Sequence, residues 1–168
     1  PLTHAKYSGR ILKKGVQYSP PPAASDPHDF DESALQKIFD NSDRDLVATL
    51  GGKANLGGTY ANAVCTLTGY QPNLATSEVD VKEVHQALKQ LLDGLANDAK
   101  GYIILKASEE QTDEELQELA NQQVDGAERD KFLQQYANEA SPILLPAHDG
   151  KAVIEFDSLC QAVDAWQG

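Results

Sequence analysis

The stretch SEVDVKEVHQALKQLLDGLANDAKGYIIL occupies residues 77–105 and decides the fold class. Its first part predicts a helix over 78–96, because apolar side chains recur every three or four residues on one helical face: Val81, Val84, Leu88, Leu91, Leu92 and Leu95. Ser77 is a suitable N-cap, and Asp80 follows three residues later in a variant of the capping box. The apolar run 102–105 predicts a short buried strand. A long amphipathic helix followed by a buried strand indicates a mixed α and β structure.

Two more helices are expected after this strand. Thr112 and Glu115 have the spacing of a capping box and open the first helix. Asp125 and Gly126 end that helix, and Asp125 with Glu128 begins the second. The side chains expected to face the core are Leu116, Leu119 and Val124 in the first helix, and Phe132, Leu133, Tyr136 and Ala140 in the second.

The C-terminal part predicts a β-hairpin and a last helix. Asp149 and Gly150 stand between the apolar runs 142–146 and 152–156, an arrangement typical of a hairpin. Ser158 is expected to cap the final helix, whose inward side chains are Leu159, Ala162, Val163 and Trp166.

The residues before the opening stretch are expected to be mostly helical. One apolar stripe predicts a helix after Asp29, formed by Ala34, Leu35, Ile38 and Phe39. Asp43 is expected to cap a short second helix that carries Leu46, Val47 and Leu50. Residues 51–58 then predict a glycine-rich loop, and residues 59–70 fit either a buried helix or a pair of strands.

Together these elements predict an α+β fold: a mostly helical single domain packed on a small sheet of three or four strands. Residues 29–168 form this acidic domain, and residues 1–28 form a basic, proline-rich arm and spacer. The arm is expected to be extended and contains one candidate strand, 11–18. The three prolines at 20–22 favour the polyproline II conformation, which makes the spacer semi-rigid.

The charge divides the chain into two parts of opposite sign. Residues 1–25 have no acid and a charge of +4, from Lys6, Arg10, Lys13 and Lys14. The whole chain has 26 acidic and 14 basic residues, so residues 26–168 carry 10 − 26 = −16. Phosphate binding requires clustered basic residues, so we expect no nucleic-acid partner. The longest apolar run is far shorter than the roughly 20 residues of a membrane span, so we expect no membrane insertion.

Cys65 and Cys160 are the two cysteines, and at this wide spacing they are expected to be buried free thiols. A cysteine hydrolase needs a thiolate close to an imidazole. Cys65, His148 and Asp149 supply the residue types, but Cys65 lies in an apolar stretch typical of a core. Cys160 lies near the start of the predicted last helix, without an evident partner in the sequence. A cysteine-dependent hydrolase therefore ranks third, after the two functional hypotheses given below.

The remaining motifs are weaker. The four histidines lack the spacing of a metal site, and the acidic segment 40–45 lacks the glycine of a calcium loop. The glycine-rich residues 51–58 lack the lysine of a phosphate-binding loop. His85 is expected to be a half-buried structural histidine. We predict no catalytic set, no metal and no cofactor.

The leading functional hypothesis is a non-catalytic protein-interaction or assembly component, such as a subunit of a multi-protein or viral particle. The arm would dock on a protein partner or on another copy of the chain, at a sheet edge or in a groove, which would give a homo-oligomer in the second case. The candidate contact residues are Lys6, Arg10, Ile11, Lys13, Lys14, Val16 and Tyr18.

The second hypothesis is an acidic inhibitor, an immunity protein or a nucleic-acid mimic that caps a basic partner. It depends on the acidic cluster in residues 109–118, with Glu109, Glu110 and Glu114 as candidate contacts. The chain opens without a charged and apolar leader, so the expected location is the cytoplasm or an assembled particle.

Overall fold

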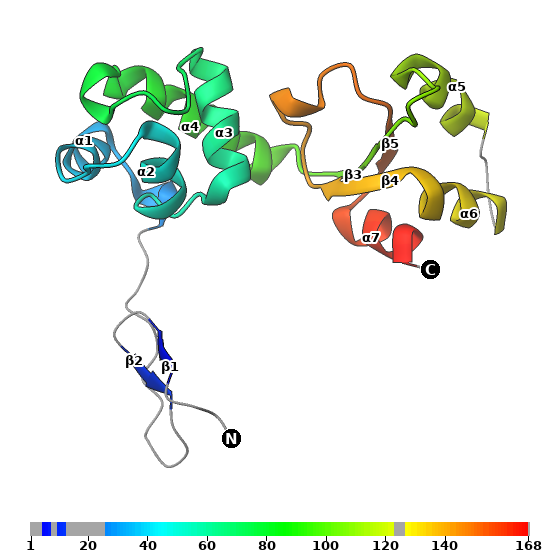
Figure 1. Cartoon of the computed structure of the whole chain (residues 1–168), viewed down its shortest axis with the longest axis horizontal. Coiled ribbons are helices and arrows are strands. Elements are labelled where there is room, and N and C mark those ends of the chain that lie inside the picture. Colours follow the sequence, from blue (N-terminus) through cyan, green and yellow to red (C-terminus); the bar gives the residue numbers. More distant parts are fainter. Residues whose placement is uncertain (1–4, 8–9, 13–25, 123–126, 168) are drawn as a thin grey trace.

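The computed structural model of the chain describes residues 5–7, 10–12, 26–122 and 127–167. Its helices and a small antiparallel sheet confirm the predicted α+β class (Figure 1). The helices are α1 (Glu32–Asp40), α2 (Leu46–Gly52), α3 (Gly57–Thr68), α4 (Val81–Asn97), α5 (Asp113–Gln122), α6 (Ala127–Tyr136) and α7 (Leu159–Gln167). The strands are β1 (Ala5–Tyr7), β2 (Arg10–Leu12), β3 (Gly101–Leu105), β4 (Ala137–Ser141) and β5 (Val153–Phe156). Three short 3-10 helices are η1 (Pro27–Asp29), η2 (Thr76–Glu78) and η3 (Pro146–His148).

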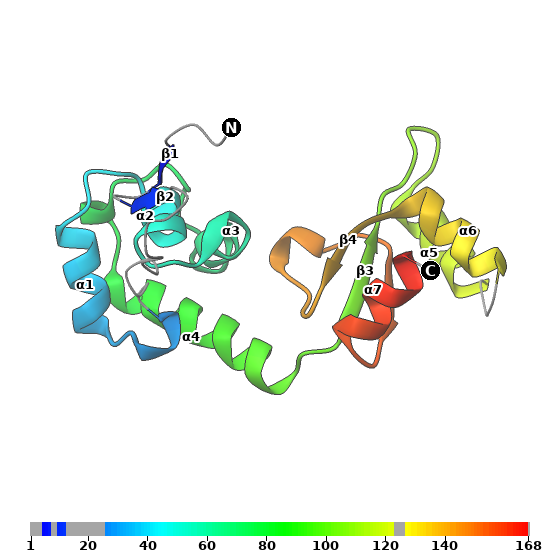
Figure 2. The same ribbon diagram turned by 90° about the horizontal axis from the view of Figure 1, so that it is seen from below.

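The first four helices pack around one apolar cluster at one end of the molecule (Figure 2). α1 buries Leu35 and Phe39 from its predicted stripe. α4 buries Val84, Leu88 and Leu91 from its own stripe, so the periodicity of both helices identified the correct faces. α4 then leads the chain towards the sheet at the other end (Figure 2).

Two helix caps differ from those predicted. Asp45, and not Asp43, caps α2, with its Oδ1 accepting a backbone N–H three residues later at 2.8 Å. Asp80, and not Ser77, caps α4, with its Oδ1 accepting a backbone N–H two residues later at 2.8 Å. Ser77 lies within η2, which delays the start of α4. Capping requires an acceptor next to the first turn, so the residue nearer the helix takes the position.

The predicted glycine-rich loop at 51–58 is wrong. α2 includes the first two of its glycines and α3 begins with the last two, so the connection is only 53–56. The ambiguous residues 59–70 are mostly α3, which buries small side chains together with Val64. α3 ends at Thr68 and is capped by Gly69, whose φ of 75° is a left-handed conformation that favours glycine.

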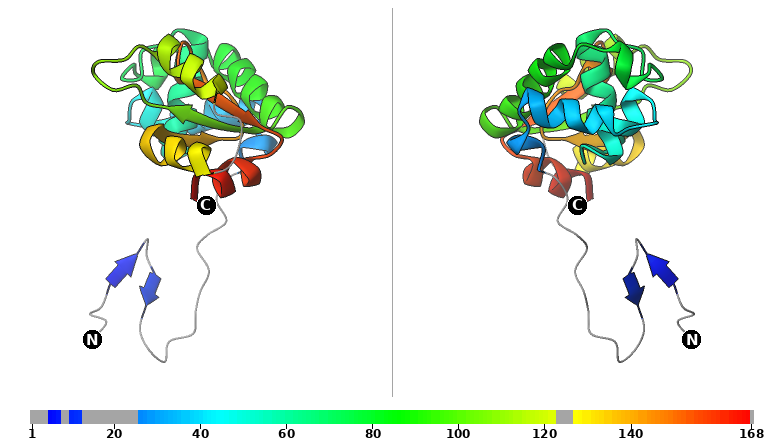
Figure 3. Two further views of the ribbon diagram at one scale, coloured as in Figure 1. Left: turned by 90° about the vertical axis from the view of Figure 1, so that its right-hand side faces the viewer. Right: turned by 90° about the vertical axis from the view of Figure 1, so that its left-hand side faces the viewer.

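The second half of the chain is built on a three-stranded antiparallel sheet in the order β4–β3–β5. The predicted strand 102–105 is therefore central, and Ile103 and Leu105 face a second apolar cluster that α5, α6 and α7 cover. Viewed along the long axis, α6 and α7 lie side by side on one face of the sheet (Figure 3). Ser158 Oγ accepts a hydrogen bond from the backbone N–H of Gln161, which confirms the predicted cap of α7.

The strand pairing of the C-terminal part differs from the prediction. Ala140 lies in β4, where the prediction extended a helix. β5 pairs with β3 and not with residues 142–146, so the hairpin around Asp149 and Gly150 is wrong. β3 is apolar on both faces and takes the central position, which a turn signal does not reveal. Because β4 and β5 lie on opposite sides of β3, the segment between them must cross the sheet.

The N-terminal strands β1 and β2 pair with each other in a separate antiparallel ladder. The predicted strand 11–18 overlaps β2 at its first two residues. Lys13, Lys14, Val16 and Tyr18 lie outside the described residues, as do residues 19–25 of the proline-rich spacer. The prediction of an extended arm therefore also lies mostly outside them.

Candidate binding groove

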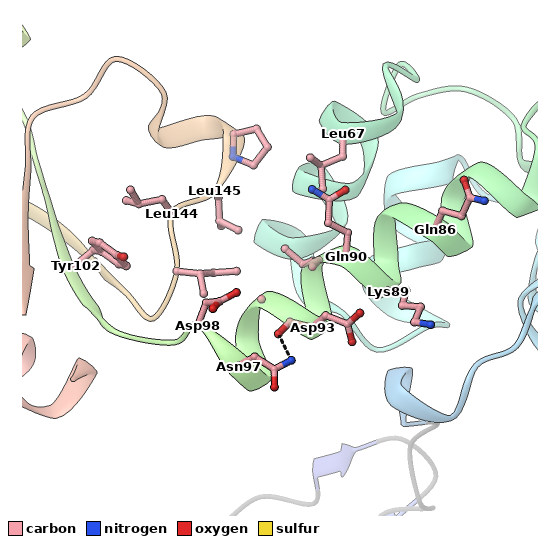
Figure 4. Close-up of a pocket in the computed structure, with 14 residues that line it drawn as sticks. Leu67, Gln86, Lys89, Gln90, Asp93, Asn97, Asp98, Tyr102, Leu144 and Leu145 are labelled. Atoms are coloured by element: carbon pink, nitrogen blue, oxygen red, sulfur yellow. Dashed lines mark hydrogen bonds between the residues drawn. The ribbon is translucent and has the colours of Figure 1, made fainter. Parts of the chain in front are cut away.

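A groove of about 710 Å³ lies between α4 and the segment that follows β4 (Figure 4). One wall consists of α4 with Leu67 of α3, and the other consists of residues 143–146 with Tyr102 of β3. Pockets that hold ligands commonly have volumes of about 300–1,000 Å³ and combine apolar walls with a few polar groups. The groove has both properties.

The groove contains the two large hydrophobic side chains that stay exposed among the described residues. Leu67 is 39 % exposed and Leu144 is 49 % exposed, although they come from α3 and from the segment after β4. Both line one concavity, which distinguishes them from the single exposed apolar residues that any surface carries.

An alternation of buried and exposed side chains places Leu144 in the groove. Ile143 and Leu145 are 9 % and 3 % exposed and belong to the apolar cluster of the four N-terminal helices. Leu144, between them, points away from that cluster, to the side of the segment on which Tyr102 lies, and it lines the groove (Figure 4). The segment after β4 is thus anchored in the helical end of the molecule, so the two walls of the groove are tied together.

Hydrogen bonds hold this segment in place. Lys100 donates its backbone N–H to Pro142 O at 2.8 Å, and Ser141 donates its Oγ–H to Ile143 O at 2.6 Å. Further along, His148 Nδ1 accepts the backbone N–H of Leu145 at 3.1 Å. These contacts fix the wall before any ligand binds.

The polar side of the groove is more acidic than basic. Lys89, Asp93 and Asp98 of the α4 region line it, and all three are exposed. A neighbouring hollow of about 310 Å³ shares Leu67 with the groove and adds Glu83. The two hollows together present three carboxylates and one ammonium group, which favours a cationic ligand.

The predicted acidic contact residues lie elsewhere. Glu109, Glu110 and Glu114 are exposed around the start of α5 and are not part of the groove. Two nearby acids have structural partners. Glu115 and Thr112 form the predicted capping box, with bonds of 2.9 and 3.2 Å. Asp113 accepts the backbone N–H of Ala152 at 3.3 Å.

The cysteines are in different environments, and the prediction that both are buried is wrong for Cys160. Cys160 is exposed on α7, because it lies outside the apolar stripe of that helix. Cys65 is buried in the helical cluster, where burial raises the pKa of its thiol. A raised pKa disfavours the thiolate that a cysteine nucleophile requires. His148, the proposed partner of Cys65, is bound instead to Leu145 and lies close to Glu139.

The remaining predicted features have structural roles or fall short of a site. His85 is half-buried as expected, with Nε2 at 2.9 Å from Phe30 O. No three His, Cys, Asp or Glu side chains within the described ranges are grouped closely enough to hold a metal ion. In the same part of the chain, no helix combines the length and the apolar character that crossing a membrane requires.

Sequence reasoning missed the groove itself, although part of its signal was visible. The run 143–145 is uniformly apolar. Its first and third residues belong to the core, so the apolar character of Leu144 between them is the part of the signal that points to the groove. Comparisons of the chain with protein-family models, curated proteins and solved structures find no match. The function is therefore inferred from the geometry of this chain alone.

Proposed function

We propose that the chain is a non-catalytic protein-interaction and assembly component, whose groove binds residues 10–18 of another copy. The observation that supports this proposal is that the exposed side chains of Leu67 and Leu144 both line one groove. Exposed apolar surface of this kind marks a binding site more often than it serves the fold.

The chemistry of residues 10–18 matches that of the groove. The segment combines the basic residues Arg10, Lys13 and Lys14 with the apolar residues Ile11, Leu12, Val16 and Tyr18. The apolar side chains suit the leucine-lined walls, and the basic ones suit the carboxylates of Asp93 and Asp98. The opposite charges of residues 1–25 and of the rest of the chain favour the same pairing over longer distances.

Docking in the groove is better supported than addition of a strand to the sheet. At the β5 edge, the side chain of Gln117 accepts the N–H of Val153 at 2.7 Å and donates to its C=O at 3.0 Å, as a paired strand would. At the other edge, β4 has a register shift opposite Ile104 and is followed by Pro142. Bulges and prolines protect edges from pairing, so strand addition is the less favoured mode.

The test is the solution mass of the full chain by light scattering, over a range of protein and salt concentrations. We expect a mass above the 18.2 kDa of one chain at low salt, decreasing as salt screens the charges. Leu144→Ser, and separately Lys13→Glu with Lys14→Glu, should return the mass to that of a monomer. Asp93→Asn should weaken assembly, whereas the matched control Asp164→Asn, on the exposed surface of α7, should not. A wild-type chain that stays monomeric at every concentration would contradict the proposal.

A second candidate is the acidic inhibitor, which the exposure of Glu109, Glu110 and Glu114 favours. These side chains lie near the start of α5, where their carboxylates can attract a basic surface of a partner. Replacing all three with glutamine should leave self-assembly unchanged if the groove is the interaction site. Loss of assembly in that variant would show that the acidic surface, and not the groove, is the interaction site.

A further inference from the structure

His148 lies at the base of the groove wall that carries Leu144. It ends η3, three residues after Leu145, and its side chain is only 5 % exposed. Its backbone N–H donates to Leu145 O at 2.8 Å, while its ring Nδ1 accepts the Leu145 N–H at 3.1 Å. Both backbone groups of Leu145 are therefore bound to one histidine.

This arrangement requires a neutral imidazole. An imidazole nitrogen accepts a hydrogen bond only while it carries no proton, so Nδ1 is unprotonated and Nε2 bears the ring proton. Nε2 lies 3.6 Å from Glu139 Oε2, which suits a protonated nitrogen facing a carboxylate. Protonation of Nδ1 would place two donors, Nδ1–H and the Leu145 N–H, face to face at 3.1 Å. The bond to Leu145 would then break.

We infer that His148 is a positioning residue for the groove and that its protonation breaks the bond that positions Leu145 beside Leu144, so that the groove binds its ligand more tightly at neutral pH than in acid. The link is direct, because Leu145 is both the partner of His148 and the neighbour of Leu144. As a regulation of the groove, the inference rests on the proposed function for its ligand.

The other ionisable groups around His148 do not remove this effect. Glu139 of β4 faces Nε2 and cannot replace the bond at Nδ1. On the same connection, Asp149 is exposed and the Lys151 side chain is bound to Asp113. α3, which packs against η3, has only Tyr60 and Cys65 as ionisable side chains and carries no Asp, Glu, His, Lys or Arg. The charge of His148 therefore decides whether the Leu145 bond persists.

The test uses a fluorescently labelled peptide with the sequence of residues 10–18, which contains no histidine. Its affinity for the full chain is measured by anisotropy from pH 8 to pH 5.5, above the usual titration range of Asp and Glu. We expect the affinity to decrease about tenfold over this range. His148→Gln supplies an amide oxygen for the Leu145 N–H and an amide N–H for Glu139, so it should bind as wild type does at pH 8 and show no decrease. His148→Leu lacks the acceptor and should bind about tenfold more weakly at every pH.

A second measurement separates this inference from the proposed function. Without peptide, the amide resonance of Leu145 in NMR spectra should shift between pH 8 and pH 5.5 in the wild type and stay fixed in His148→Gln. If the peptide binds at no pH but this shift occurs, the proposed function is wrong and the proton-sensitive wall stands. If the peptide binds with the same affinity at every pH, or if His148→Gln keeps the pH dependence, the inference is wrong.

Discussion

Replacing Gly101 with alanine would show how closely β3 packs against α7. The φ of Gly101 is not positive, so alanine can adopt its backbone conformation. Alone, this change would stabilise the chain by about 0.4–1 kcal/mol, because alanine restricts the unfolded state. However, the new Cβ would lie 2.5 Å from the carbonyl carbon of Ser158 and 2.9 Å from the Cβ of Ala162. Carbon atoms in contact are about 3.5–4.0 Å apart, so α7 would have to move by roughly 1 Å.

Overpacking of this kind costs about 1–3 kcal/mol, which exceeds the gain. We therefore expect Gly101→Ala to lower the free energy of unfolding by about 1–2 kcal/mol. In urea, with a slope of about 2 kcal/mol per molar, the midpoint should fall by about 0.5–1 M. Trp166, the single tryptophan of the chain and part of α7, reports on the affected cluster by its fluorescence.

Gly94 provides the matched control for this substitution. It lies inside α4 with no atom within 4 Å of an added Cβ, so alanine there should stabilise the helix by about 0.5–1 kcal/mol. The same change should thus move the midpoint upward at Gly94 and downward at Gly101. A midpoint for Gly101→Ala at or above that of the wild type would refute the steric argument.

Three further predictions concern single side chains. A thiol reagent at neutral pH should label one cysteine, the exposed Cys160, in the native chain and two in denaturant, because Cys65 is buried and its thiol pKa is raised; two reactive thiols in the native state would contradict this. Tyr70 donates to the Glu83 carboxylate at 2.6 Å, and this bond raises the pKa of the phenol, so Glu83→Gln should move the ultraviolet titration of Tyr70 to lower pH. Since the folded-state pKa of Tyr70 is the higher one, the stability that this bond contributes should be complete below pH 10 and be lost as the pH rises through the folded-state value. Gln117→Ala leaves two backbone groups at the edge of β5 without their partner and should lower the free energy of unfolding by about 1–2 kcal/mol in urea titrations.

Periodicity predicted the helices and the central strand well, because burial of an apolar stripe is a local property of the sequence. The stripe of α4 and the run that forms β3 lie where the sequence places them. Strand pairing is different, since it depends on which partners compete for β3. Asp149 and Gly150 are typical of a hairpin turn, but no hairpin forms around them. β4 and β5 both follow β3 in the chain and pair with it on opposite sides, so β5 pairs with β3 and not with residues 142–146.

The groove could not be predicted for a related reason. Its walls come from α3, α4, β3 and the segment after β4, and their proximity follows from the crossing of the sheet by residues 142–152. The contact residues proposed from the sequence rest on charge and on the strand pattern of residues 11–18. Charge is visible along the chain, whereas a concavity requires the packing of distant elements. The sequence offers His148 as the imidazole of a cysteine hydrolase, but its bond to Leu145 gives it a positioning role.

The segment 143–145 shows why the groove is more than a by-product of packing. Crossing the sheet brings this segment to the helical cluster, and the fold gains from burying Ile143 and Leu145, each worth about 1.5–3 kcal/mol when fully buried. Leu144 gives the fold little of this energy, since half of its surface stays in water. A polar residue between the two anchors would serve the crossing equally well and would not expose apolar surface. Because Leu67 faces the same concavity from α3, the exposed surface on both walls fits a site that is completed by a ligand.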